Sequence, residues 1–208
     1  MNKLEIPCSY QGGKQRLAKQ IVDIFYEENN IDDDTKFYDL CCGSGAISLE
    51  LINRGFNPNN ITMIDNGCFG QFWQDIANDE FKLNVFREEI DKLPSLENIQ
   101  SYLKELSNQQ VDEDKMVYHY LLLQAGAFGS KQIWIENGKW RIVLPEKLSS
   151  KMANSLYSIL NSALQDEWKI ETPHEVFLVT GDEIGKGSDN EPLIRNVKIL
   201  EKILLNKI

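Results

Sequence analysis

Apolar residues recur at helical spacing along most of the chain. Between residues 14 and 28, Leu17, Ile21, Ile24 and Phe25 form one apolar stripe among polar neighbours, which is the pattern of a helix with one buried face. A denser apolar run predicts a more deeply buried helix that ends at glycines near residue 126. We predict helices over residues 14–28, 46–53, 81–92, 97–106, 115–127, 148–167 and 191–208, and one more after the aromatic-rich segment 68–73.

Short apolar runs of strand type lie between these helices. Residues 36–40, 61–65 and 175–179 are separated from one another by helical segments, so they predict parallel strands of one sheet. Two further runs, 133–135 and 140–144, flank Asn137-Gly138. Asn-Gly between two β-type runs is a strong signal for a hairpin with a two-residue turn.

The order of these elements predicts the fold class. We expect an α/β protein with a doubly wound, Rossmann-like sheet, in which residues 1–67 form the ligand-binding half. The segment 68–172 holds helices and the hairpin, and we expect it to form an insertion lobe. Residues 173–208 would return to the core sheet and end in a helix.

The ends of the first two strands carry acidic residues that suggest a binding site. Asp39 opens the turn Asp39-Leu40-Cys41-Cys42-Gly43-Ser44-Gly45, and Asp65 ends the second strand. In doubly wound folds, ligands bind beyond the strand ends, where an acidic residue accepts hydrogen bonds from a ribose. The turn is neither the dinucleotide fingerprint nor the phosphate-binding loop, so S-adenosylmethionine, a nucleoside with a small sulfonium arm, fits it better than a pyrophosphate. The alternative is an ordinary turn whose glycines only permit positive φ before a helix.

A second motif, Ser9-Tyr10-Gln11-Gly12-Gly13-Lys14, precedes the first long helix. With the Asp39 to Gly45 turn, it resembles the opening of Dam-type DNA adenine methyltransferases, especially phage-borne members. The resemblance continues at Asp65-Asn66, at residues 120–138, which are similar to the family's target-recognition lobe, and at Gly181-Asp182. It implies a methyltransferase fold, a DNA substrate and S-adenosylmethionine as the cofactor. The residues that would bind this cofactor are Tyr10, Gly12, Gly13, Lys14, Asp39, Cys41, Gly43, Gly45, Asp65, Asn66 and Asp182.

The chemistry of these residues agrees with such roles. Gly12 and Gly13 permit close approach of backbone amides to an anion, and Lys14 at a helix start would pair with the methionyl carboxylate. Asp65 would accept from the ribose hydroxyls, and Asp39 would lie near the amino group. The alternatives are a solvated lysine at a helix start and two carboxylates that only cap turns.

One motif that the resemblance implies is not found. Family members carry a D-P-P-Y-type tetrapeptide, which holds the amino group of the target adenine and stacks on the flipped base. The six prolines here lie at positions 7, 58, 94, 145, 173 and 192, and none are adjacent. Asp189-Asn190-Glu191-Pro192 is the nearest remnant.

Three functional hypotheses follow from this departure. The first is one half of a split adenine methyltransferase, or a diverged member, with a partner chain or a homodimer covering the open sheet edge. The second is a non-catalytic regulator or decoy that acts through protein partners, with phage anti-defence as one such role. The third, methylation of a small molecule or a protein, suits an acidic chain, but no acid–base pair in the sequence supports it.

Charge and composition qualify the DNA hypothesis. The net charge is −10 at pH 7, whereas proteins that grip duplex DNA usually present a basic face. The four cysteines show no C-x-x-C spacing, so we expect neither a metal site nor a disulfide framework. No apolar run is long enough to span a membrane, and the first residues lack the apolar core of a signal peptide. We therefore expect a cytoplasmic protein without membrane contact.

Several other side chains have chemistry but no obvious role. Cys41 and Cys42 lie near a helix start, where a thiol pKa can fall, yet packing of small residues is the favoured interpretation. His119 lies within an apolar helix and is interpreted as structural. Trp134 and Trp140 on the hairpin fit the core and an interaction surface equally well.

Overall fold

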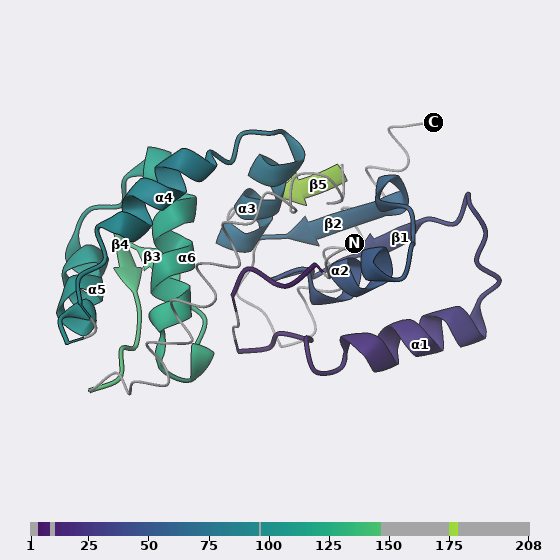
Figure 1. Ribbon diagram of the computed structural model, residues 1–208, viewed down its shortest axis with the longest axis horizontal. Coiled ribbons are helices and arrows are strands. Elements are labelled where there is room, and N and C mark those ends of the chain that lie inside the picture. The colour runs from purple at the N-terminus through teal and green to yellow at the C-terminus, as the bar shows by residue number, and fades with distance from the viewer. Residues whose placement is uncertain (1–3, 9–10, 96, 147–174, 179–208) are drawn as a thin grey trace.

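The computed structural model describes residues 4–8, 11–95, 97–146 and 175–178. A small sheet with two helices forms one part of the molecule, and a helical lobe with a hairpin forms the other (Figure 1). Tyr10, Asp182 and the helices predicted over 148–167 and 191–208 lie outside the described residues.

The sheet contains three parallel strands in the order β1-β2-β5. These are β1 (Phe37–Asp39), β2 (Ile61–Asp65) and β5 (Glu175–Leu178), so the three predicted parallel strands are confirmed. Asp39 lies opposite Met63, two residues before the end of β2. Because both strands point the same way, the two acidic strand ends lie at the same edge of the sheet.

Two helices flank the first strand, and one of them differs from its prediction. α1 (Ala18–Glu28) contacts α2 (Ala46–Asn53), and the short helix η1 (Pro58–Asn60) leads into β2. α1 begins four residues later than predicted, because residues 14–17 form a turn in which the Leu17 N–H donates to the Lys14 carbonyl at 2.8 Å.

The predicted buried stripe of α1 is wrong except at Phe25, which packs against the core. Leu17, Ile21 and Ile24 are 49%, 38% and 57% exposed, whereas Ala18 and Val22 are buried. The helix has two apolar faces, and the smaller residues of the Ala18–Val22 face permit the close approach to the core. Ile21 is left on the outer face, where it lines a pocket described below.

The lobe is built around one helix that is buried nearly all round. α6 (Met116–Gly126) contacts α4 (Leu83–Asp91) and α5 (Ile99–Asn108), and it follows η2 (Glu113–Lys115). After α6 come η3 (Phe128–Ser130) and the hairpin strands β3 (Trp134–Glu136) and β4 (Lys139–Arg141). The turn residues Asn137 and Gly138 have φ angles of 53° and 71°, as a two-residue hairpin with Asn-Gly requires, which confirms the predicted hairpin.

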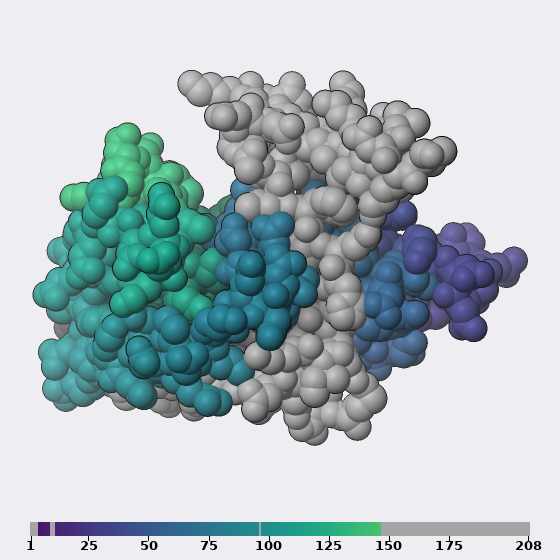
Figure 2. All heavy atoms as spheres, turned by 90° about the horizontal axis from the view of Figure 1, so that it is seen from above, coloured from purple at the N-terminus to yellow at the C-terminus, as the bar shows by residue number. Residues whose placement is uncertain are grey.

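α3 (Cys68–Ala77) joins the sheet to the lobe. It contacts β2 and β5 on one side and α6 on the other, and Figure 1 shows it between the two parts. The rings of Phe69 on α3 and Tyr120 on α6 meet edge to face, with centroids 5.1 Å apart. In the space-filling view the lobe forms one continuous mass, with the green hairpin segment at its margin and α1 at the opposite end (Figure 2).

His119 has the structural role that was expected. Its Nε2 lies 3.2 Å from Oε2 of the buried Glu89, whose Oε1 accepts from Lys92 at 2.6 Å and from Lys115 at 3.1 Å. Burial of Glu89 opposes its ionisation, but the hydrogen bonds from the three partners prevail and lower its pKa to about 2. The cluster therefore pins α4 to α6.

Candidate functional site

The turn after β1 continues the sheet and then enters α2. The Cys42 N–H donates to the Ile64 carbonyl at 3.0 Å, and the Gly45 N–H donates to the Cys42 carbonyl at 2.8 Å. Gly43 and Gly45 have φ angles of 50° and 76°, in the left-handed region that favours glycine. These bonds hold the turn against the end of β2.

Gly45 is required by its surroundings as well as by its backbone. A Cβ at this position would lie 2.5 Å from Cζ2 of Trp73 and 3.1 Å from Cε of Met63. Trp73 is buried, and its indole N–H donates to the Gly43 carbonyl at 2.8 Å. The contact of Trp73 with the turn was not predicted from the sequence, in which the aromatic-rich segment 68–73 was its only signal.

Both carboxylate oxygens of Asp65 accept hydrogen bonds from backbone N–H groups at the turn and just after β2. Its Oδ2 accepts from the Gly43 N–H and its Oδ1 from the Gly67 N–H, both at 2.9 Å. Burial raises the pKa of Asp65, while backbone hydrogen bonds from Gly67, Gly43 and Asn66 lower it in part. A carboxylate offers about four lone-pair positions, so Asp65 can accept a further hydrogen bond beside these three.

Asp39 is a second carboxylate at the same edge. Its Oδ2 accepts from the Ser48 hydroxyl at 2.8 Å. Burial raises the pKa of Asp39 to about 6; the Ser48 hydrogen bond opposes this shift and the charge of Asp65 adds to it. Two carboxylates that repel each other in a partly dry setting are stabilised by a nearby cation.

A pocket of about 380 Å³ opens beside Asp39 and the start of the turn. It is within the usual size range of small-molecule sites. Its lining residues come from the segment before α1, from α1, from the β1–α2 turn and from α2, and are Lys14, Ile21, Tyr38, Asp39, Leu40, Cys41, Cys42, Ala46 and Ile47. Three of the expected site residues, Lys14, Asp39 and Cys41, therefore meet at one cavity. Gly43, Gly45 and Asp65 are not among its lining residues: the two glycines lie in the β1–α2 turn, Asp65 ends β2, and Asn66 is exposed beyond β2.

Lys14 lies at the mouth of this pocket without being at a helix N-terminus. Its Nζ donates to the Gly12 carbonyl at 2.6 Å. Gly12 has a φ of 99°, so the segment needs glycine there. The prediction that the α1 dipole adds to Lys14 in binding an anion is wrong, because α1 begins only at Ala18 and dipole effects fade within one turn.

Ser44 is a residue of the turn that the sequence analysis missed. Its side chain is buried at 1% exposure, and among the described residues its Oγ is the one buried side-chain oxygen or nitrogen without a hydrogen-bond partner. An unpaired buried hydroxyl costs free energy. A ligand at the turn could satisfy it.

The buried Cys42 of the site is not an activated thiol. Burial raises the pKa of the Cys42 thiol well above its ordinary value, and the charges of Asp65 and Asp39 raise it further. The described residues contain no cluster of histidine, cysteine, aspartate and glutamate that could hold a metal ion. The raised pKa of Cys42 agrees with small-residue packing at this turn.

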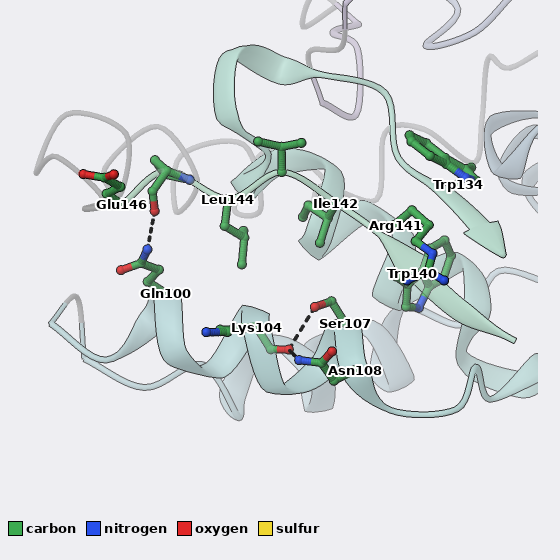
Figure 3. Close-up of a pocket in the computed structure, with 12 residues that line it drawn as sticks. Gln100, Lys104, Ser107, Asn108, Trp134, Trp140, Arg141, Ile142, Leu144 and Glu146 are labelled. Atoms are coloured by element: carbon green, nitrogen blue, oxygen red, sulfur yellow. Dashed lines mark hydrogen bonds between the residues drawn. The ribbon is translucent and has the colours of Figure 1, made fainter. Parts of the chain in front are cut away.

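A larger pocket, of about 570 Å³, lies in the lobe between α5 and the segment that follows β4. Gln100 on α5 donates to the Pro145 carbonyl across one end of it, and the exposed Lys104 is among its lining residues (Figure 3). Trp140 is 4% exposed, whereas Trp134 is 55% exposed. The open alternative is thus resolved: Trp140 belongs to the core and Trp134 to the surface.

The hairpin region carries several cations in a chain that is acidic as a whole. Lys131, Lys139 and Arg141 are exposed on or beside β3 and β4. Arg141 Nε pairs with Glu136 at 2.7 Å.

Comparison with known proteins places these features in a family. Among the described residues, no helix has the length and apolar character needed to cross a membrane. No curated protein sequence matches the chain. The family model of D12 class N6 adenine-specific DNA methyltransferases matches residues 10–185, a range that includes the glycine motif, both acidic strand ends and the whole lobe. The chain therefore belongs to the D12 class N6 adenine-specific DNA methyltransferase family.

Proposed function

We propose that this chain binds S-adenosylmethionine beside the β1–α2 turn and serves adenine methylation in DNA. The observation that carries the proposal is the joint placement of Asp39 and Asp65 at the ends of adjacent parallel strands, tied to one glycine turn beside a pocket. The pair of carboxylates suits a cationic ligand. The chain's family supports the same cofactor.

The residues present fit such a ligand. Asp65 retains a lone pair for a ribose hydroxyl, and Ser44 has a buried hydroxyl without a partner among the described residues. Lys14 would leave the Gly12 carbonyl to pair with the methionyl carboxylate, and Asp39 would face the amino group. The backbone of Gly43 and Gly45 would lie against the ligand, next to Cys41 and Asn66. By resemblance, Tyr10, Gly12, Gly13 and Asp182 complete the set.

S-adenosylmethionine supplies the activated methyl group, and the protein's part is binding and orientation. Asp65 holds the turn in shape while it accepts from the ligand. Asp39 takes up a proton when the site is empty and pH is below about 6. A cationic ligand would favour its ionised form.

We also propose that the sheet is doubly wound. Among the described strands, β1 pairs with β2 and has no strand on its other side. A reversal of strand order at β1 would place the pocket at the switch point, where ligands of this fold class bind. We propose the division of the chain into residues 1–67, 68–172 and 173–208 as well. α3, which begins at the boundary at residue 68, contacts both the sheet and α6.

The hairpin is the proposed contact with DNA. Trp134 is exposed on β3, and Lys131, Lys139 and Arg141 are exposed on or beside the hairpin, with Arg141 paired to Glu136. Aromatic and basic side chains together suit stacking on bases and neutralisation of phosphates. The local concentration of cations offsets part of the acidity of the whole chain.

We propose that the adenine pocket is completed by a D-P-P-Y segment outside residues 1–208, in a split arrangement. By resemblance to the family, such a segment holds the amino group of the flipped adenine, and no two prolines are adjacent in this sequence. The alternative form of this hypothesis is a diverged enzyme in which another segment takes the role of the D-P-P-Y motif.

Two measurements test the proposal. Calorimetry with S-adenosylhomocysteine should show binding, and the absence of heat at high micromolar ligand would refute the cofactor site. Incubation of the 208-residue chain with labelled cofactor and unmethylated DNA should give no transfer until a polypeptide with a D-P-P-Y strand is added. Robust transfer by the chain alone, abolished by Asp65→Ala, would refute the split arrangement.

The second candidate is a non-catalytic regulator or decoy. The net charge of −10 favours it, because an acidic surface suits protein partners better than DNA. This candidate predicts cofactor binding without transfer, whatever polypeptide is added.

A further inference from the structure

The η3 turn joins the glycine segment near the pocket to the hairpin. The Gln11 N–H donates to the Ser130 carbonyl at 2.5 Å, and Gln11 immediately precedes Gly12 and Gly13. The Phe128 N–H, at the start of the same turn, donates to the Val143 carbonyl beyond β4 at 2.8 Å. Figure 1 shows the N-terminal segment passing beside the end of α6, where η3 begins.

One buried side chain holds this turn in shape. Gln124, near the end of α6, is 1% exposed. Its Nε2 donates to the carbonyls of Ser130 and Lys131 at 3.4 and 3.0 Å, and its Oε1 accepts from the Ile133 N–H at 3.2 Å. Both the amide nitrogen and the amide oxygen of Gln124 therefore bind the backbone of the few residues between α6 and β3.

The backbone of the turn needs this support. Gly129 and Ser130 have consecutive positive φ angles of 61° and 55°. A non-glycine residue in this region is strained and persists only where its surroundings determine it. The Ser130 carbonyl thus points to Gln11 because Gln124 fixes Ser130 itself and the residues that follow it, Lys131 and Ile133.

We propose that Gln124 is a positioning residue that couples the hairpin to the Gly12–Lys14 segment, so that occupancy of the hairpin by DNA raises affinity at the cofactor pocket. The inference rests on the proposed function. The physical link is short: a displacement of β3 or of the segment that follows β4 moves η3, and η3 holds Gln11 through one hydrogen bond. Linkage requires the effect to be reciprocal.

The test compares the dissociation constant of S-adenosylhomocysteine with and without saturating duplex DNA. The full chain should show a ratio of roughly 5 or more, which is the low end of usual coupling. Gln124→Met keeps the length of the side chain and removes its hydrogen bonds, and should bring the ratio close to 1. Gln100→Met is the control, since Gln100 also donates to a backbone carbonyl in the lobe, that of Pro145, and makes none of the described hydrogen bonds to η3.

A second pair of variants avoids the buried position. Gln11→Pro removes the N–H that reaches Ser130, whereas Gln11→Ala keeps it. We expect the ratio to be lost in Gln11→Pro and kept in Gln11→Ala. This pair of variants tests the coupling even if Gln124→Met does not fold.

Hydrogen exchange gives a readout that needs no ligand. The Gln11 amide should exchange at least tenfold faster in Gln124→Met than in Gln100→Met. A ratio of 1 in the wild type, or an unchanged ratio in both Gln124→Met and Gln11→Pro, would overturn the coupling while leaving the cofactor site intact. Absence of ligand binding in the wild type would instead overturn the proposed function and, with it, this inference.

Discussion

Oδ2 of Asp65 accepts the N–H of Gly43 at 2.9 Å, across 22 residues of sequence. The carboxylate at the end of β2 thereby sets the shape of the turn that follows β1. A residue expected to contact a ligand is also part of the fold. Substitutions at Asp65 will therefore change stability and binding together, and the two effects must be measured separately.

Asp65→Ala should weaken S-adenosylhomocysteine binding by about 1–3 kcal/mol, the usual cost of removing a partner of buried polar groups. It should also lower the melting temperature, because the N–H groups of Gly43 and Gly67 lose their acceptor. Calorimetry and thermal unfolding measure the two effects. Asp34→Ala, an exposed carboxylate, is the control and should change neither.

Ser44→Ala should weaken ligand binding without lowering stability, in contrast to Asp65→Ala. The hydroxyl has no hydrogen-bond partner among the described residues, so its loss should leave the free energy of unfolding unchanged or slightly higher. If a ligand satisfies it, affinity for S-adenosylhomocysteine should fall by about 1 kcal/mol. Unchanged affinity would show that the hydroxyl plays no part in binding.

Gly45→Ala should destabilise the chain more than Gly55→Ala. Both glycines have positive φ, 76° and 88°, but a Cβ at Gly55 meets nothing within 4 Å while one at Gly45 meets Trp73 at 2.5 Å. We expect about 1 kcal/mol for the backbone strain shared by both, and about 1–3 kcal/mol more at Gly45 for overpacking. Urea unfolding measures the difference, and equal costs would contradict the close packing on Trp73.

Asp39 should make the folded state less stable as pH rises. Its pKa is about 6 in the folded state against an ordinary value of 3.8, so the folded state holds the proton over a range in which the unfolded chain has lost it. Stability from this group is greatest below about pH 4 and falls until about pH 6, by on the order of 3 kcal/mol in total.

Asp39→Asn tests this dependence. It should stabilise the chain at pH 7.5 relative to wild type and lose that advantage at pH 4, with the Ser48 hydroxyl still donating to the amide oxygen. Urea unfolding at both values gives the comparison. If Asp39 faces the ligand's amino group, the same variant should bind S-adenosylhomocysteine more weakly at pH 7.5. A stability difference that does not change with pH would contradict the raised pKa.

Lys14→Ala should weaken S-adenosylhomocysteine but leave adenosine affinity nearly unchanged, because only the former carries a carboxylate. Lys14 is exposed at the pocket and free to leave the Gly12 carbonyl, so a charge-assisted contact is available. Lys19→Ala, an exposed lysine on α1, is the control. Equal losses for both ligands would mean that Lys14 only supports the local backbone.

Much of the local structure followed from the sequence because it depends on near neighbours. Helical spacing predicted the helices of the lobe, Asn137-Gly138 predicted the hairpin, and short apolar runs predicted three parallel strands. The turn after Asp39 was evident from its glycines and from the acidic residue before it. The start of α1 and most of its buried face, Phe25 excepted, were predicted wrongly, because two apolar stripes compete on that helix and only packing chooses between them.

The tertiary structure decided how these pieces act together. Residue pattern does not encode the contact of Trp73 with Gly43, at a separation of 30 residues, or the hold of Gln124 on η3. The raised pKa of Asp39 depends on burial and on the nearby Asp65, which no periodicity reveals. Sequence alone thus determined which elements form and which residues carry chemistry, because backbone preference and side-chain spacing are local. Folding decided which of those residues share a pocket and how each is charged, because desolvation and close packing arise only when distant segments meet.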